Sequence, residues 1–342
     1  MFAPVALGSR QVDRSTGRQV GREKAIVISR HHTRTRHRVI PWGRSAAVFV
    51  MAGALTLSGC AQNTEGPNAG GAGTGAAASS TAVAAPKVDA IAATVPADIR
   101  DSGTLVVGVN LPYPPNEFKD AQGEIVGFDV DLMNAVASTL GLTAEYRESD
   151  FAKIIPAIDG GTYNVGMSSF TDTKEREKQV DFVTYFSAGS LWAQRPGEAI
   201  DPNNACGKKV AVQATTIQET DEVPAKSKAC VNAGQPEIQI VKFDGQDAAT
   251  NAVVLGQVDA MSADSPVTAY AIKQSNGKLE GAGEIFDSAP YGWPVKKGSP
   301  MAQSLMQALE HLISTGDYKA IATYWGVESG MIDKPVINGA VS

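Results

Sequence analysis

The chain has 342 residues, of which 43% are hydrophobic, 19% charged and 6% aromatic, a composition that suits one or two globular domains and excludes collagen-like, coiled-coil and wholly disordered chains. The formal net charge is −6, but residues 1–59 hold ten Lys and Arg against two acids, which leaves 20 cations and 34 anions in the rest. Such an acidic body argues against nucleic acid as a partner. Because His311 is the only histidine after residue 59, we predict no metal site, no cofactor and no catalytic histidine.

The first segment with a clear pattern is an apolar run over residues 45–57. It is about thirteen residues long, shorter than the roughly 20 that a membrane-spanning helix needs, and it follows a basic stretch that ends at Arg44. This layout predicts a secretory signal peptide over residues 1–59. The 44 residues before the run are long for a signal, so we expect the true translation start downstream of Met1.

The signal ends in Leu57, Ser58, Gly59 and Cys60, which resembles a bacterial lipobox. We therefore expect Cys60 to carry a diacylglyceryl group and to anchor a lipoprotein at the extracytoplasmic face of the cell membrane. The alternative is a cleaved signal with an incidental cysteine. Residues 60–95 are mostly Gly, Ala, Ser, Thr and Pro, and this predicts a flexible tether with a reach of roughly 30 Å.

The two other cysteines, Cys206 and Cys230, lie in the predicted exported part of the chain. Outside the reducing cytosol, two such cysteines favour a disulfide, which would close a loop of about 25 residues and contribute on the order of 3 kcal/mol. The alternative is two separately buried thiols.

From Thr104 onward, strand-like and helical runs alternate, which predicts an α/β fold with a mostly parallel sheet. The first unit has strands over 105–109, 143–146 and 164–167, a helix that begins at Phe128, and a second helix with Ile154, Ile155 and Ile158 on one face. The second unit starts after Pro202, with strands over 209–213, 237–243 and 258–262. Two units in about 240 residues predict two lobes.

The chain crosses between these lobes near residues 189–197 and 286–296, which predicts a two-strand hinge. Lobe 1 is expected over 96–193 and again over 290–335, lobe 2 over 194–289, and a tail over 336–342. Ligands of open α/β sheets bind at the carboxyl ends of strands, where helix N-termini present free N–H groups. The strand-to-helix junctions are therefore the candidate binding segments.

Three of these junctions carry polar groups that suit a small charged ligand. After residue 167, Thr171 and Arg176 can bind an anion, with a helix cap and a surface arginine as the alternative. After residue 262, Asp264 can bind an ammonium group or act only as the N-cap of the next helix. After residue 213, Thr216 and Glu219 predict a capping box, and Thr215 and Thr216 can also contact an anion.

Two aromatic residues, Tyr113 and Phe151, also stand at junctions. Both can be ordinary core residues, which is the usual position of aromatics. At a cleft they would instead enclose the side chain of a ligand.

The segment Gly127 to Leu132, which reads Gly-Phe-Asp-Val-Asp-Leu, resembles the signature of the bacterial extracellular solute-binding proteins, family 3. These are the polar-amino-acid receptors of ABC importers. The likeness runs from about Leu105 to Trp325 and includes the segments 151–156, 167–176, 180–182, 256–264 and 316–326. It implies a two-lobed type II periplasmic-binding-protein fold that closes on an amino acid in the interlobe cleft.

By motif match, the resemblance implies a binding role for seven residues. Arg176 would bind the ligand carboxylate with Thr171 and Thr216; Asp264 and the Ser169 carbonyl would bind the ammonium group; Tyr113 and Phe151 would flank the side chain. Asp129 would cap the helix that follows Gly127. Asn110 stands where receptors for cationic amino acids have an acid, which leans the prediction towards Gln, Asn, Glu or Asp.

The resemblance also implies the partners: an amino acid, the permease and ATPase of an ABC importer, and a membrane reached through the lipid anchor, with the receptor itself a monomer. The rival hypotheses are an exported enzyme on the same fold, a dehydratase or peptidoglycan lyase with Asp264 or Glu117 as general acid, and a sensor ectodomain.

Overall fold

The part of the chain that the structure describes, residues 85–341 of a computed structural model, is built on an eight-stranded sheet in the order β4-β1-β5-β10-β6-β9-β7-β8. These residues all belong to one compact unit. The strands at both ends of the sheet pair in parallel, and two long strands in the middle, β6 (Val180–Gln194) and β10 (Glu280–Lys296), pair antiparallel. The sheet therefore combines two parallel halves, one in each lobe.

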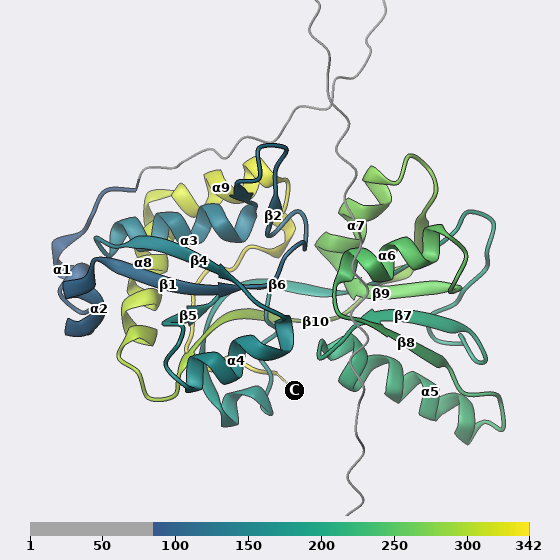
Figure 1. Ribbon diagram of the computed structural model, residues 1–342. Coiled ribbons are helices and arrows are strands. Elements are labelled where there is room, and N and C mark those ends of the chain that lie inside the picture. Colours follow the sequence, from purple (N-terminus) through teal and green to yellow (C-terminus); the bar gives the residue numbers. More distant parts are fainter. Residues whose placement is uncertain (1–84, 342) are drawn as a thin grey trace, which may run out of the picture. The chain divides into compact units, whose positions relative to one another are not determined.

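Lobe 1 contains the parallel strands β1 (Thr104–Val109), β4 (Thr143–Glu148) and β5 (Val165–Gly166). Its helices α3 (Phe128–Thr139) and α4 (Phe151–Asp159) lie on opposite sides of these strands (Figure 1). Leu105, Val107 and Val109 alternate along β1 and are fully buried in a core shared with α3, α8 (Met301–Thr315) and α9 (Asp317–Trp325). The smaller elements of this lobe are α1 (Asp89–Ala92), α2 (Ala97–Ser102), β2 (Phe118–Lys119), β3 (Ile125–Val126) and the 3₁₀ turns η1 (Arg176–Lys178) and η3 (Glu328–Gly330).

Lobe 2 repeats the arrangement with the parallel strands β7 (Lys209–Gln213), β8 (Gln239–Phe243) and β9 (Ala260–Asp264). Val210 and Val212 of β7 face a core that contains Val223 of α5 (Val223–Asn232), whereas Ala211 faces the opposite core with α6 (Gln246–Val254). The π-helix η2 (Gln218–Glu222) leads into α5, and α7 (Ser265–Gln274) follows β9. Apolar residues thus alternate between two buried faces in both lobes.

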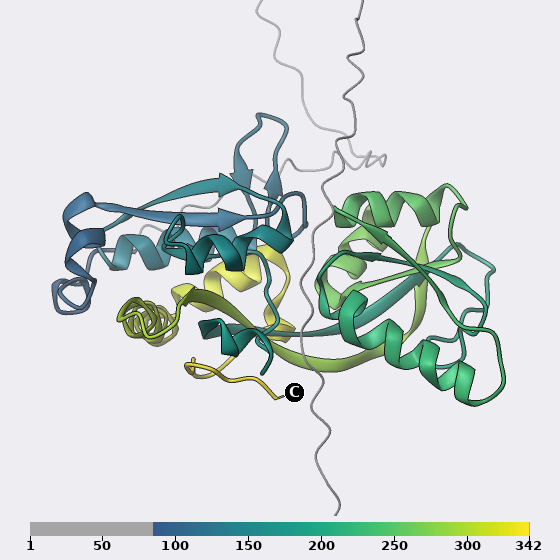
Figure 2. The same cartoon turned by 60° about the horizontal axis from the view of Figure 1, so that its bottom comes forward.

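The two lobes are connected by β6 and β10, which extend through both halves of the sheet (Figures 1 and 2). Val180 of β6 pairs with Lys296 of β10 in lobe 1, and Gln194 pairs with Glu280 at the far end in lobe 2. The last helices, α8 and α9, return to lobe 1, where they pack on α3. The observed hinge thus has two antiparallel strands.

Residues before the predicted start of lobe 1 at residue 96 also pack on this lobe. Ala85 and Val95 are buried against lobe 1, the Val88 N–H donates to Thr139 O (2.9 Å), and the Thr94 hydroxyl donates to Ser304 Oγ (2.9 Å). Residues 85–95 are therefore packed, although the sequence predicts a tether there. The predicted signal over 1–59, Cys60 and the rest of the predicted tether lie outside the described residues. Within 85–341, the helices are too short or too polar to span a bilayer.

Candidate functional site

One cavity lies where the carboxyl ends of strands from both lobes meet. It is small, with a volume of about 10 Å³, because lining groups of the two lobes contact one another directly. Lobe 1 and lobe 2 both contribute to its lining, which consists of Asn110, Tyr113, Phe151, Ser168, Ser169, Thr171, Arg176, Gln213, Thr216, Ile217, Gln218 and Asp264. The site therefore lies in the interlobe cleft, at the sheet edge where open α/β folds bind ligands.

Arg176 brings a cation into the cavity from lobe 1. Its Nη1 donates to Thr171 O (2.8 Å) and its Nη2 donates across the cleft to Thr215 O (2.9 Å). The guanidinium also lies over the rings of Phe151 and Phe170, at 5.6 Å and 5.5 Å from their centroids. Burial lowers its pKa to about 10, against the raising effect of Asp264, so the group keeps its charge at neutral pH.

Asp264 brings an anion into the same cavity from lobe 2. It occupies the N-cap position of α7, but its side chain makes no capping hydrogen bond. Instead, the Tyr113 hydroxyl donates to Oδ2 (2.8 Å) and the Gln218 amide donates to Oδ1 (2.9 Å). Burial raises the pKa of the Asp264 carboxyl, and the hydrogen bonds and the charge of Arg176 act in the opposite direction. The Asp264 carboxylate therefore does not cap α7 and faces the cavity instead.

Aromatic rings form one wall of the cavity. Phe151 stacks on Phe170 with ring centroids 4.3 Å apart and an interplanar angle of 15°. Tyr113 lies on the same lobe and is buried, with 6% of its surface exposed. Such a wall can enclose an aliphatic chain or stack on a planar guanidinium.

Two amide side chains meet across the cleft at another part of the lining. The Gln213 Nε2 donates to Asn110 Oδ1 (2.8 Å), and it also donates to the carbonyl of Asp244 (3.1 Å). The Asn110 amide in turn donates to the carbonyl of Ser149 (2.9 Å). These neutral groups offer both donors and acceptors to a polar ligand side chain.

A buried carboxyl pair, Glu117 and Asp129, lies directly behind Ser168 and Ser169. The Ser168 hydroxyl donates to Glu117 Oε1 (3.1 Å), and the Ser169 N–H and hydroxyl donate to Asp129 Oδ2 (3.3 and 3.2 Å). Burial raises the pKa of both acids, that of Asp129 to about 6, and the neighbouring Asp129 raises the pKa of Glu117 as well. Through these bonds the pair holds both serines at the cavity wall, Ser169 with a positive φ of 50°.

Seven of the eight predicted ligand residues line the cavity. The exception is Thr215, which is exposed and reaches the site through the carbonyl that accepts from Arg176. Its role through the hydroxyl therefore remains a prediction, as do the ligand contacts of the other seven.

Two expectations about helix starts are wrong in detail. The predicted capping box of Thr216 and Glu219 does not form, because Glu219 Oε2 accepts from the Thr215 N–H (3.1 Å) and the Thr216 hydroxyl donates to Gln213 O (2.7 Å). The turn there continues into a π-helix. Asp129 does not cap α3 either, since the carboxylate lies within the first turn and accepts from Ser169 and Tyr185.

Sequence reasoning overlooked the roles of Gln213, Ile217 and Gln218 in the lining, and of Phe170, whose ring lies near the Arg176 guanidinium. Gln213 is the last residue of a predicted strand, so its position was a usable signal. Gln218 has no such signal, because its contact with Asp264 depends on the course of η2.

Away from the cleft, Cys206 and Cys230 form a disulfide with their Cα atoms 5.5 Å apart. Cys230 is buried on α5 in the core of lobe 2. Among residues 85–341, no three His, Cys, Asp or Glu side chains gather closely enough to suggest a metal site.

Comparison with known proteins identifies the family. Residues 105–328 match the model of the bacterial extracellular solute-binding proteins, family 3. The chain belongs to this family. As the sequence resemblance predicts, it is therefore a solute-binding protein, and the family match gives no support to an exported enzyme.

Individual relatives cover most of the chain. The Arginine-binding protein ArgT of Corynebacterium glutamicum is 39% identical over 296 residues, which is 86% of this chain and 95% of that protein. The ABC transporter glutamine-binding protein GlnH of Bacillus subtilis is 30% identical over 67% of this chain and 83% of its own length.

The solved structure of an ancestral arginine-binding protein bound to arginine matches with a TM-score of 0.61 and 37% identity, covering 65% of this chain and 98% of that one. This likeness confirms the predicted two-lobed periplasmic-binding fold.

Proposed function

We propose that this chain is the receptor of an ABC importer and binds a polar α-amino acid between its lobes. The observation that carries the proposal is the placement of Arg176 and Asp264 around one cavity, each from a different lobe. A free α-amino acid carries a carboxylate and an ammonium group on one carbon, and this pair of charges complements it. A ligand held by both lobes would favour the closed arrangement.

In this proposal Arg176 binds the carboxylate, with help from Thr171 and Thr216, and Asp264 binds the ammonium group together with the Ser169 carbonyl. Arg176 suits the carboxylate because its planar guanidinium can donate two parallel hydrogen bonds. Tyr113 and Phe151 flank the ligand side chain. We propose that the receptor acts as a monomer, as the family resemblance implies.

We propose arginine as the first ligand to test. The similarity to ArgT over most of the chain supports arginine, and so does the aromatic wall, on which a guanidinium can stack. The carbonyl oxygens of Asn110 and Gln213 could accept its N–H groups.

The second candidate is a neutral or acidic amino acid, as the sequence predicts from Asn110, with glutamine first among Gln, Asn, Glu and Asp. Two observations favour glutamine: the amide groups of Asn110 and Gln213 can donate to and accept from a ligand amide, and among the described residues Asp264 is the only acid in the lining. The similarity to GlnH supports the same choice.

Isothermal titration calorimetry of the purified protein with each of the twenty amino acids tests both parts of the proposal. Arginine is expected to bind at least about tenfold more tightly than glutamine, lysine or histidine. The order reversed, with glutamine tightest, would favour the second candidate. Agmatine, which lacks the carboxylate, serves as the control and is expected to bind far more weakly. Equal binding of agmatine and arginine would contradict the role of Arg176.

We further propose that Cys60 carries a lipid that holds the receptor at the extracytoplasmic face of the membrane, as the lipobox predicts. Mass spectrometry of the mature N-terminus checks it, with a diacylglyceryl cysteine as the expected first residue. A Cys60→Ala variant is expected to move from the membrane fraction to the medium, and an unchanged membrane fraction would contradict the anchor.

A further inference from the structure

The segment Val336–Ala340, which we name the C-terminal strap, runs antiparallel to the start of β6. The Thr184 N–H donates to Val336 O and the Asn338 N–H donates to Phe182 O, both at 2.9 Å. The Asn338 side chain completes the pairing, since its Oδ1 accepts from the Phe182 N–H (2.9 Å) and its amide donates to Asp181 Oδ1 (2.9 Å). The sequence predicts a tail here, but these residues are bound to lobe 1.

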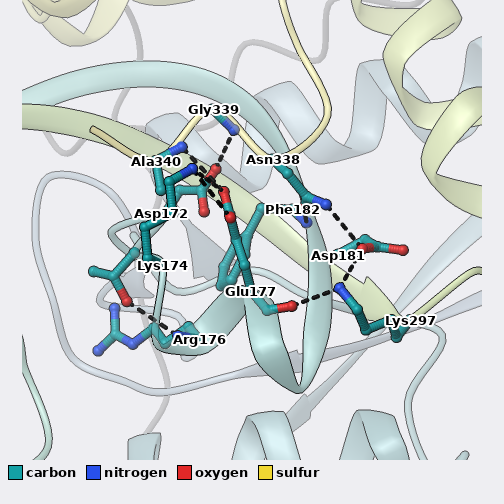
Figure 3. A network of polar contacts seen from close by, with 11 residues as sticks. Asp172, Lys174, Arg176, Glu177, Asp181, Phe182, Lys297, Asn338, Gly339 and Ala340 are labelled. Carbon is teal, nitrogen blue, oxygen red and sulfur yellow. Dashed lines mark hydrogen bonds and ion pairs between the residues drawn. The ribbon is translucent and has the colours of Figure 1, made fainter. Parts of the chain in front are cut away.

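The end of the strap reaches the loop that carries two predicted ligand residues. The Gly339 N–H donates to Asp172 Oδ2 (2.7 Å), and the Ala340 N–H donates to Glu177 Oε1 (3.1 Å), as Figure 3 shows. Asp172 directly follows Thr171, and Glu177 directly follows Arg176. The strap therefore holds this loop next to both of its cavity-lining residues.

Further contacts hold Asp172, Glu177 and Gly339 in place. The Asp172 side chain is fully buried, and the Asp172 N–H donates to Pro290 O of β10 (2.9 Å). Glu177 is also bonded to Lys174, with its Oε2 3.2 Å from Nζ. Gly339 leaves room for the approach, because a Cβ there would lie 2.9 Å from the Thr184 methyl. In Figure 3 the Arg176 guanidinium points away from the strap, so the strap acts on the ligand residues only through the loop.

We propose that the C-terminal strap is a positioning element for ligand binding: by holding Asp172 and Glu177 it fixes Thr171 and Arg176 in the geometry that receives the ligand carboxylate. The inference rests on the proposed function, because it assigns the strap to the carboxylate end of that same site. The peptide N–H groups of Gly339 and Ala340 both donate to carboxyl oxygens, and the bond to the Glu177 carboxylate is charge-assisted, which makes it stronger than a neutral one.

Two truncations of the full chain test the proposal. A chain that ends at Pro335 lacks the strap, and a matched control that ends at Ala340 keeps it. With arginine as the probe in calorimetry, the first is expected to bind about tenfold more weakly, as mutations along a coupled network do, and the control within about twofold of the wild type. Equal affinities of wild type and both truncations would overturn the proposal.

A conservative pair separates positioning from a general loss of stability. Glu177→Gln keeps an oxygen for the Ala340 N–H and is expected to retain near-wild-type affinity, whereas Glu177→Ala loses the acceptor and is expected to weaken binding severalfold. If both variants bound equally, the contact would have no positioning role.

Hydrogen exchange without any ligand keeps the test independent of the amino acid. In the chain ending at Pro335, amide exchange is expected to rise over residues 171–178 but not in lobe 2. If the wild type bound no amino acid but this local rise occurred, the proposed function would be contradicted, whereas the positioning role of the strap would be supported. Unchanged exchange over 171–178 would overturn the positioning whatever the ligand.

Discussion

Arg176 and Asp264 are charged side chains that face the same cavity but differ in what holds them. The guanidinium lies over two phenyl rings and donates to two carbonyl groups, one in each lobe. The carboxylate accepts from Tyr113 and Gln218. Each charge is thus oriented by neutral groups, which leaves it available to an opposite charge on a ligand.

Replacing Arg176 by Ala is expected to reduce affinity for arginine by at least about 100-fold, because two charge-assisted hydrogen bonds of roughly 1.5 to 3 kcal/mol each are lost. Arg176→Lys keeps the charge but not the planar pair of donors, so its affinity for arginine should lie between those of the wild type and of Arg176→Ala. Calorimetry measures both, and circular dichroism checks that the fold is kept. Arg100→Ala, on the exposed side of α2, is the control. Wild-type affinity in Arg176→Ala would refute the assignment.

Affinity is also expected to depend on pH through Asp264, whose pKa burial raises. A ligand ammonium group needs the ionised carboxylate, so binding should weaken as the pH falls through this raised pKa. The stability of the ligand-free protein has the opposite sign: the contribution of Asp264 is present at low pH and is lost as the pH rises through the same pKa.

The check is calorimetry from pH 8 downward on the wild type and on Asp264→Asn. Asp264→Asn should bind the ligand weakly at every pH. It should also lack the loss of affinity that the wild type shows as the pH falls through the raised pKa of Asp264. Parallel pH profiles for the two proteins would count against Asp264 as the ammonium partner.

Helix α5 is joined to the loop before β7 by a disulfide bond. The disulfide from Cys206 to Cys230 closes a loop with a sequence separation of 24, and this loop includes β7 and η2, which carry Gln213 and Gln218. The bond therefore constrains the segment of lobe 2 that faces the ligand.

Removing this bond in the double variant Cys206→Ser, Cys230→Ser is expected to lower the free energy of unfolding by about 3 kcal/mol in the chain-entropy account. Urea unfolding with and without reductant measures it. Reductant should destabilise the wild type and leave the double variant unchanged. A wild type that is indifferent to reductant would contradict the prediction.

Much of this element structure is predictable from the sequence, because buried strands and helices impose distinct periodicities. β7 has the bounds that the sequence predicts, and α3 begins at Phe128 as expected. β9 is shifted: the sequence predicts a strand over 258–262, but it runs from Ala260 to Asp264, which places Asp264 at its end.

The site is less predictable than the fold. Charged residues at junctions give a signal, which is why Arg176 and Asp264 could be proposed. The contacts of Gln218, of Asp129 and of the C-terminal strap could not, because they join residues far apart in sequence through backbone paths that periodicity does not encode. Asp129 stands near the start of a helix, where a capping role is the simpler prediction from sequence. Its actual partner, the Ser169 N–H, is 40 residues away and gives no local signal.

Across the whole described chain, three hydrogen bonds of the site join the lobes: Tyr113 to Asp264, Gln213 to Asn110 and Arg176 to Thr215. Each uses a group that the proposed ligand would also contact. The ligand would therefore exchange direct contacts between the lobes for contacts through itself.

Such a ligand should stabilise the entire chain, since it needs both lobes at once. At about 100 times its dissociation constant, arginine is expected to add about 2.7 kcal/mol to the free energy of unfolding, which is several degrees in melting temperature. Differential scanning calorimetry should show a single transition that moves upward as a whole. A shift confined to one of two separate transitions would mean that only one lobe holds the ligand.

The place of β10 between β5 and β6 has a consequence for biosynthesis. The part of this strand that lies in lobe 1 is made after all of lobe 2, and the helices α8 and α9 that complete the first core follow later still. A nascent chain that stops before residue 280 lacks the strand that lies between β5 and β6 in the sheet. Lobe 1 is therefore expected to fold only after nearly complete synthesis, and in the proposed export of this chain that delay would keep it unfolded for translocation.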